Sequence, residues 1–149
     1  MGFFYCNALL ILAVDQLLKY LVTHFLRFGQ SVPLIGEAVK LTYVRNTGAA
    51  FSLFVGFSPY LAAVGALVVV LVVYYHYKTP AGNRLMQLGL ACLLGGSLGN
   101  LADRLLHSYV IDYIDISVWP VFNFADIAIN VGALLILLNF FRSPGGEKG

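Results

Sequence analysis

Four long apolar segments, separated by shorter polar ones, set the pattern of this chain. Each is about as long as the roughly 20 apolar residues that a helix needs to cross a bilayer, and together they cover residues 3–25, 58–77, 85–106 and 121–141. Trp119 and Pro120, just before the last segment, are typical of a membrane interface and a helix start. The pattern predicts four transmembrane helices.

The segment between the first two apolar runs has a different pattern. Residues 27–57 contain Gly29, Pro33 and Gly36, and residues 39–44 are rich in β-branched and aromatic side chains with partial alternation. We therefore expect a small extramembrane β-sheet there. The predicted fold is a mainly α membrane protein, one domain over residues 1–149, with four transmembrane helices and this sheet after the first helix. Residues 143–149, rich in Gly, Pro and charge, are expected to be disordered.

Composition supports a membrane protein and excludes several other classes. Hydrophobic residues make up 60% of the chain and charged residues 11%, against about 45–50% and about 25% in soluble domains. The net charge of +2, without a basic patch, gives no indication of nucleic-acid binding. Cys6 and Cys92 lie in apolar segments and are not expected to form a disulfide framework. The first segment lacks the basic start and cleavage site of a removable signal peptide.

Acidic residues are concentrated between Gly95 and Asp126. Seven occur in the whole chain, and four of them fall in this window: Asp103, Asp112, Asp115 and Asp126. Carboxylates beside membrane-spanning sequence are costly and usually serve a function. With four alternating spans, the 27–57 and 107–120 loops lie on the same side of the membrane. We therefore expect a site at that surface, to which Asn46 and Asn100 can also contribute.

Helical spacing groups the polar residues of the spans. Asn100, Asp103 and His107 share one stripe of a helix, and Asn123, Asp126 and Asn130 share another. In the first span, Asp15 and Lys19 are neighbours at i, i+4. Two interpretations of that pair stay open. Either it neutralises itself while Lys19 extends toward the interface, or Asp15 tethers a neighbouring helix or a substrate backbone.

These residues favour aspartate chemistry over other kinds of hydrolysis. Two close carboxylates in a low-dielectric site share a proton, so that one can activate water while the other protonates or polarises the substrate. Metal ligands are not expected, because the three histidines are scattered. Gly95-Gly96-Ser97-Leu98-Gly99 matches the G-x-S-x-G nucleophile elbow but lies inside an apolar helix, where close helix packing is the favoured interpretation.

The positive-inside rule does not orient the chain by itself. Basic residues are equally frequent on the two sides: Lys78, Arg84, Arg142 and Lys148 on one, and Arg27, Lys40, Arg45 and Arg104 on the other. If Arg45 and Arg104 serve the site, the balance places both termini in the cytoplasm.

Five short segments occur in a fixed order along the chain: Asp15-Gln16-Leu17-Leu18-Lys19, Asn46-Thr47-Gly48-Ala49-Ala50-Phe51-Ser52, Gly99-Asn100-Leu101-Ala102-Asp103-Arg104, Val110-Ile111-Asp112-Tyr113 and Phe122-Asn123-Phe124-Ala125-Asp126. In this order, on a four-span chain, they resemble the bacterial lipoprotein signal peptidase (signal peptidase II) family nearly end to end. Two positions depart from the family pattern, Leu18 and Ile127, where Ser or Thr and Ser are common.

The resemblance implies an inner-membrane aspartic endopeptidase that removes the signal peptide from prolipoproteins before a diacylglyceryl-modified cysteine. It carries the catalytic roles to Asp112 and Asp126. Supporting or substrate-binding roles carry to Asp15, Asn46, Gly48, Asn100, Asp103, Arg104 and Asn123. Asp115 is interpreted as a solvated or structural carboxylate.

The resemblance also implies partners and a location. The expected partners are the modified prolipoprotein, membrane lipid and inhibitors of the globomycin type, with no cofactor, for an enzyme that acts as a monomer. The expected location is the bacterial cytoplasmic membrane, with both termini cytoplasmic and the site at the periplasmic or outer face.

Two other functions stay open on residue chemistry alone. A small proton-coupled transporter or channel subunit would use intramembrane carboxylates such as Asp15, although the second and fourth spans are nearly bare of polar residues beyond one end. A structural assembly factor leaves the clustered aspartates unexplained.

Overall fold

The four predicted spans are helices in the computed structural model, which describes residues 1–48 and 58–142. The expectations for Ala49 to Ser52 and for the tail at 143–149 lie outside the described residues. The helices are long and apolar enough to cross a membrane; their bounds are α1 Gly2–Phe25, α2 Ser58–Lys78, α3 Arg84–His107 and α4 Phe124–Arg142. The prediction of a four-span membrane fold is confirmed in this part of the chain.

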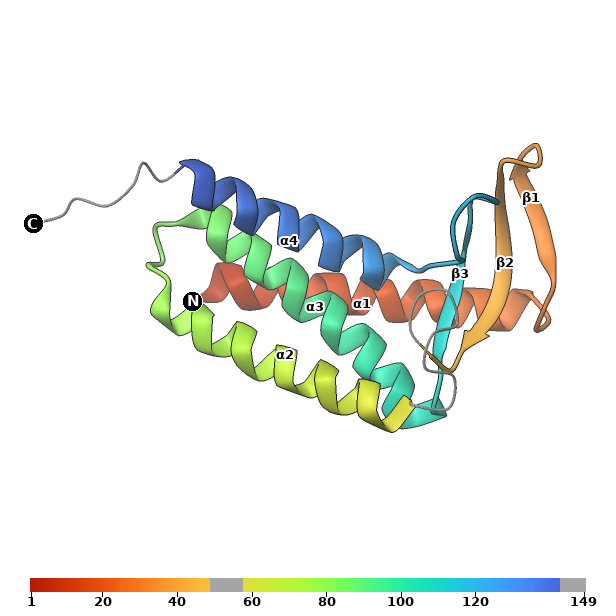
Figure 1. Cartoon of the computed structure of the whole chain (residues 1–149), viewed down its shortest axis with the longest axis horizontal. Helices are drawn as coiled ribbons and strands as arrows, with labels where there is room; N and C mark the ends of the chain where they lie inside the picture. Colours follow the sequence, from red (N-terminus) through yellow and green to blue (C-terminus); the bar gives the residue numbers. More distant parts are fainter. Residues whose placement is uncertain (49–57, 143–149) are drawn as a thin grey trace, which may run out of the picture.

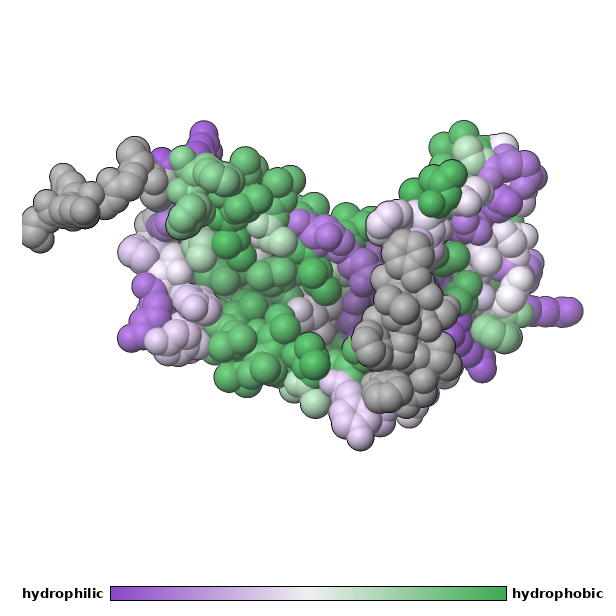
Figure 2. Space-filling view, viewed as in Figure 1, coloured by the Kyte–Doolittle hydropathy of each residue, from purple (hydrophilic) through white to green (hydrophobic). Residues whose placement is uncertain are grey.

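Helix α3 lies at the centre of the bundle and contacts the other three helices (Figure 1). Its most apolar stretch is 61% buried within the protein, against 22% or less for α1, α2 and α4. The outer helices instead expose large apolar side chains, among them Leu9, Leu67 and Leu137. Figure 2 shows a broad hydrophobic surface over the helices. Outer faces of this kind suit contact with lipid.

Glycines of α3 allow its neighbours to approach closely. A Cβ at Gly95 would come within 2.7 Å of the Ala8 carbonyl oxygen of α1, and a Cβ at Gly96 within 2.5 Å of the Ala125 carbonyl oxygen of α4. Small residues at such crossings let the helix backbones pack together. Ser97 is buried and lies within helix α3, so this stretch is not a nucleophile elbow and the packing interpretation holds.

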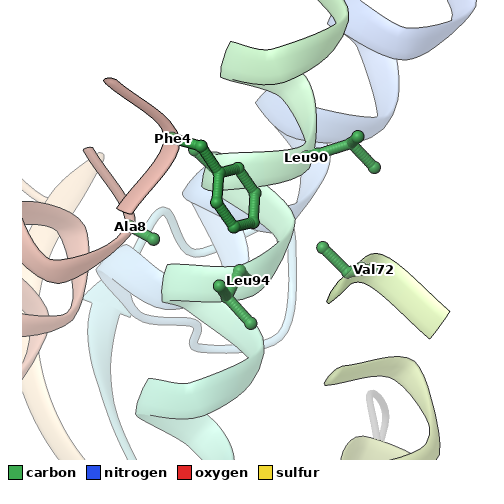
Figure 3. Packing of buried hydrophobic residues seen from close by; sticks show 6 residues of the cluster. Phe4, Ala8, Val72, Leu90 and Leu94 are labelled. Atoms are coloured by element: carbon green, nitrogen blue, oxygen red, sulfur yellow. The ribbon is translucent and has the colours of Figure 1, made fainter. Parts of the chain in front are cut away.

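The apolar end of the bundle, near the N-terminus, is held by ordinary hydrophobic packing. Phe4 and Ala8 of α1 pack with Val72 of α2 and with Leu90 and Leu94 of α3 (Figure 3). A second cluster joins α1 to the sheet at the other end of the molecule. Its buried members are Val22, Tyr43, Ile111 and Tyr113.

The sheet has three antiparallel strands in the order β1-β2-β3 and stands across one end of the helices (Figure 1). β1 (Ser31–Ile35) and β2 (Val39–Asn46) come from the predicted β region. β3 (Val110–Asp115) comes from the segment that we expected to be a loop, so that expectation is wrong. The strand forms because three of its apolar residues are buried and its backbone pairs with β2, Val44 opposite Asp112.

Helix α4 begins three residues later than predicted. We expected a start near Pro120, but the chain after it stays extended and Phe122 pairs with Ile114 of β3. The Phe122 N–H donates to the Ile114 carbonyl oxygen at 3.0 Å, and the Ile114 N–H donates back to Phe122 at 2.7 Å. These bonds satisfy backbone groups that a helix would otherwise use, so the helix starts at Phe124.

Candidate active site

The polar residues singled out from the sequence gather where the helices meet the sheet. Helix α1 ends there, α2 and α4 begin there, and the N-terminus and the end of α4 lie at the opposite end (Figure 1). In Figure 2, hydrophilic residues lie between the apolar helical surface and the sheet. The expected convergence of the two loops on one side is therefore seen in the described residues.

Helix α1 contributes a buried ion pair to this region. Asp15 and Lys19 are almost fully buried, and the Lys19 ammonium lies 2.8 Å from Asp15 and 2.9 Å from Asp103 of α3. Asp15 also accepts a hydrogen bond from the Ala125 N–H in the first turn of α4 at 3.0 Å. Asp15 therefore tethers neighbouring helices, and the alternative in which Lys19 extends to the interface is wrong.

Helix α3 presents Asn100 and Asp103 toward the site, as the stripe predicted. Besides its pairing with Lys19, Asp103 accepts a hydrogen bond from the Ile111 N–H of β3 at 3.0 Å. Asp103 thus connects α1, α3 and the sheet. His107, on the same stripe, is exposed and stacks on Tyr109, so it is not part of this network.

Asp126 lies in the first turn of α4, where it exchanges hydrogen bonds with Asn123. The Asn123 N–H donates to Asp126 Oδ2 at 3.1 Å, and the Asp126 N–H donates to Asn123 Oδ1 at 3.0 Å. This is the reciprocal arrangement of a capping box, which satisfies N–H groups at a helix start. Asn100 adds a third contact, from Nδ2 to Asp126 Oδ1 at 2.8 Å. The cap fixes the carboxylate at the positive end of the helix.

Asp112 lies on β3 and is 2% exposed. Asn123 Nδ2 donates to its Oδ1 at 2.7 Å, and Asn46 Nδ2 donates to its Oδ2 at 2.9 Å. Burial raises the pKa of Asp112 to about 7, the nearby Asp126 charge acts in the same direction, and the two amide contacts oppose them.

Asp112 and Asp126 line one cavity of about 620 Å³. Asn46, Gly48, Asn100 and Arg104 also line it. The Arg104 guanidinium is half-buried and donates to the Gly48 carbonyl oxygen at 3.4 Å, and the Gly48 N–H donates to Asn46 Oδ1 at 3.0 Å. The structure thus brings together at this cavity six of the nine residues that the sequence pointed to.

The remaining three predicted residues, Asp15, Asp103 and Asn123, are buried behind the cavity wall. Asp115 lies at the end of β3, where it accepts hydrogen bonds from the Ser117 N–H and the Thr42 hydroxyl, both at 2.8 Å. These contacts lower the pKa of Asp115, as suits a structural carboxylate. Among the described residues, no group of three His, Cys, Asp or Glu side chains could hold a metal ion.

Sequence reasoning missed part of the cavity. Its other wall is apolar and includes Trp119, Val121, Ile129 and Val131, with Asn130 among them. Asn130 donates from its amide to the Asp126 carbonyl oxygen at 2.8 Å. The i, i+3, i+7 spacing from Asn123 did indicate Asn130. In the sequence, however, Trp119 indicates only a membrane interface, and the other apolar residues indicate only contact with lipid.

The arrangement has the elements of acid–base hydrolysis. Two carboxylates from different elements face one cavity, and the amides of Asn100 and Asn123 bridge them. One carboxyl group is poised to hold a proton near neutral pH, as a general acid requires. Arg104 supplies a fixed positive charge at the same cavity.

Comparison with known proteins places the chain among membrane peptidases. Residues 7–142 match the family model described as signal peptidase (SPase) II. The lipoprotein signal peptidase of Moorella thermoacetica is 42% identical over 142 residues, which are 95% of this chain and 94% of that protein. The lipoprotein signal peptidase of Bacillus subtilis is 36% identical, over 97% of each chain.

Solved structures agree with this match. One, described as a bacterial membrane enzyme at 2.3 Å resolution, superposes with a TM-score of 0.91 at 29% identity and covers 100% of this chain and 94% of that chain. A second bacterial membrane enzyme, at 1.9 Å, has a TM-score of 0.87 at 28% identity over 97% and 96% of the two chains.

Proposed function

The chain belongs to the signal peptidase II family, and we propose that Asp112 and Asp126 are the catalytic pair of this membrane-embedded peptidase. Membership of the family supports a protease that removes signal peptides from prolipoproteins. The proposed finer function is hydrolysis of the peptide bond before a diacylglyceryl-modified cysteine, by a water molecule activated between the two aspartates.

One observation carries the proposal. Asn123 donates from its side chain to Asp112 and from its backbone to Asp126, and both carboxylates face the same cavity. A single residue thus sets the positions of two carboxyl groups relative to each other. This is what a shared-proton pair requires, because the water and the scissile bond must lie between the two groups.

The surroundings favour different tasks for the two aspartates. Asp112 is buried, its pKa is raised to about 7, and it suits the protonated partner that polarises the substrate carbonyl. Asp126 is less buried and lies at a helix N-terminus. Its carboxylate accepts two hydrogen bonds, from the Asn123 backbone N–H and from the Asn100 side-chain NH2 group. Such an environment stabilises an anion, so Asp126 suits the base that takes the proton from water.

The cavity also suits a lipid-modified peptide. Its apolar wall runs from Trp119 near the sheet to Val131 on α4, so acyl chains can lie along α4 while the peptide crosses the pair. Arg104 is placed to donate to a substrate carbonyl oxygen. Asn46 is engaged at both ends of its amide, by Asp112 and Gly48, and we assign it to holding Asp112.

We further propose that the site opens at the periplasmic or outer face of the bacterial cytoplasmic membrane, with both termini in the cytoplasm. The N-terminus and the end of α4 at Arg142 lie at the end of the bundle opposite the site (Figure 1). Family membership indicates a protease, and this favours the peptidase over a transporter or an assembly factor.

The experiment that tests this function uses purified protein in detergent with two matched substrates. One is a diacylglyceryl-modified prolipoprotein and the other is the same chain without the lipid. The proposal predicts cleavage of the modified substrate only, a new N-terminus at the modified cysteine by mass spectrometry, and loss of cleavage with a globomycin-type inhibitor. Equal cleavage of both substrates, or a cut elsewhere, would contradict it.

A further inference from the structure

Lys19 occupies a position that the catalytic proposal does not yet explain. It is 2% exposed although it carries an ammonium group in a transmembrane helix. A buried charge is costly unless it is fully paired. Lys19 contacts Asp15 at 2.8 Å and Asp103 at 2.9 Å, and one of these carboxylates would be enough to neutralise it. A third contact points to a further role.

That third contact is a hydrogen bond from Lys19 Nζ to Asn100 Oδ1 at 3.1 Å. An ammonium group has donors only, so it can face the oxygen of an amide but not its NH2 group. Asn123 Nδ2 donates to the same oxygen at 3.1 Å. The Asn100 oxygen is therefore held by two donors, Lys19 Nζ and Asn123 Nδ2.

The orientation of Asn100 then determines what Asp126 meets. With its oxygen held by Lys19, the Asn100 amide presents its NH2 group to Asp126 Oδ1 at 2.8 Å. A flipped amide would present an oxygen to the carboxylate, which is repulsive when Asp126 is ionised. Lys19 itself does not line the cavity, so it acts on Asp126 through Asn100.

We propose that Lys19 is a positioning residue, which locks the Asn100 amide so that its NH2 group holds Asp126 as an oriented anion. This inference rests on the proposed function, because it gives Asp126 the role of the base. The charged groups near Asp112 and Asp126 are Lys19 and Asp15 from α1 and Asp103 and Arg104 from α3. The contacts that orient Asp126 run from Lys19 through Asn100.

The test must separate this role from simple support of the fold. Lys19→Met keeps the unbranched stem but leaves two buried carboxylates without their cation, and it can fail to fold for that reason alone. Lys19→Met/Asp103→Asn removes one of those charges and leaves the net charge of the cluster as it is in the wild type. It is compared with Asp103→Asn, which retains the bond from Lys19 to Asn100.

A control for loss of buried polar contacts comes from the other end of α3. Gln87 is 4% exposed; its Oε1 accepts a hydrogen bond from His76 Nδ1 at 2.6 Å, and its Nε2 donates to the Thr79 carbonyl oxygen at 3.0 Å. Gln87→Leu therefore weakens the bundle without contacting the aspartates. All rates are normalised to the folded protein recovered by size-exclusion chromatography.

The substrate is the diacylglyceryl-modified prolipoprotein, and kcat and KM are measured across pH. Relative to Asp103→Asn, the double variant is expected to lose about 100-fold in kcat, the effect of misplacing a catalytic group by about 1 Å, with KM unchanged. The charge of Lys19 lowers the pKa of Asp112. Loss of this charge should therefore move the fall of activity at high pH to a higher pH. Gln87→Leu should lower the amount of folded protein but leave the profile in place.

Two results would overturn the inference. One is a double variant as active as Asp103→Asn. The other is a double variant that loses activity while its pH profile stays in place, as the profile of Gln87→Leu is expected to do. That result would mean that Lys19 only supports the fold. Absence of cleavage by the wild type would instead contradict the proposed function, so the two failures are distinguishable.

Discussion

Asn123 donates from Nδ2 to Asp112 Oδ1 at 2.7 Å while its own Oδ1 caps the N–H of Asp126 at 3.0 Å. One side chain thus has two separable duties, to start helix α4 and to hold the buried aspartate of β3. The amide of Asn can serve both because it carries a donor and an acceptor. Asn123 is fully buried, so water does not compete for either contact.

Replacing Asn123 should therefore separate stability from activity. Asn123→Ala removes the cap and the side-chain contacts with Asp112, Asn100 and Ile111. It should lower the free energy of unfolding by about 1 kcal/mol through the lost cap, and it should also impair cleavage. Asn123→Ser keeps a capping oxygen but has no NH2 group for Asp112. We expect near wild-type thermal stability in detergent but a loss of activity similar to that of the Ala variant.

Wild-type cleavage by Asn123→Ser would show that the contact with Asp112 is not needed. Equal losses of stability in both variants would show instead that the serine does not cap α4.

Gly99 makes room for Asp15. A Cβ at this position would collide with the Asp15 carboxylate, which holds Lys19 and the first turn of α4. Gly99→Ala should therefore displace Asp15, lower the thermal stability in detergent and abolish most cleavage.

Gly65 of α2 provides the matched control. A Cβ there would lie 3.8 Å from Leu101, an ordinary contact. Gly65→Ala should keep activity and gain stability, because Ala is favoured over Gly in a helix by about 1 kcal/mol. If both alanine variants behave alike, the explanation by a collision with Asp15 is wrong.

The pKa of Asp112 predicts how activity depends on pH. If Asp112 must hold a proton, kcat/KM should fall as pH rises through about 7, the value to which burial raises its pKa. The apparent value belongs to the pair of aspartates. Asp115→Asn, which changes a carboxyl group whose pKa is lowered by its Ser117 and Thr42 contacts, should leave the profile unchanged. If the fall in kcat/KM at high pH moved in Asp115→Asn, the titrating group would not be Asp112, and this prediction would be wrong.

The same pKa has a consequence for stability. The folded-state pKa of Asp112 is raised above its ordinary value of 3.8, so the folded state binds the proton more tightly than the unfolded state does. The contribution of Asp112 to stability is present in full below pH 3.8 and is lost as pH rises through about 7. The melting temperatures of the wild type and of Asp112→Asn, plotted against pH, should therefore diverge between these pH values, with the variant relatively more stable at pH 8. Parallel curves would contradict this account.

The four spans and the meeting of the loops could be predicted because a membrane imposes long apolar runs on a sequence. The strand at Val110–Asp115 was harder to predict. Its sequence, VIDYID, does not alternate between apolar and polar residues, and its pairing partner β2 lies more than sixty residues earlier in the chain. Strand pairing over such a distance leaves no local signal, although the β-branched residues Val110 and Ile111 were an available hint.

The first turn of α4 and the state of Lys19 show two other limits. Trp119 and Pro120 carry the usual signs of a helix start, yet bonds between Phe122 and Ile114 hold the chain extended beyond them. Lys19 could be interpreted as an interfacial side chain because its second partner, Asp103, is on another helix. In both cases a tertiary contact overrides a local preference.

The central claim is that Asp112 and Asp126 together perform the cleavage, and one experiment tests it most directly. Asp112→Asn, Asp126→Asn and Asp115→Asn are purified in detergent, checked for folding, and given the diacylglyceryl-modified prolipoprotein beside the wild type. The account predicts that wild type and Asp115→Asn release the signal peptide, whereas folded Asp112→Asn and Asp126→Asn do not. Substantial cleavage by either of these two variants would contradict it.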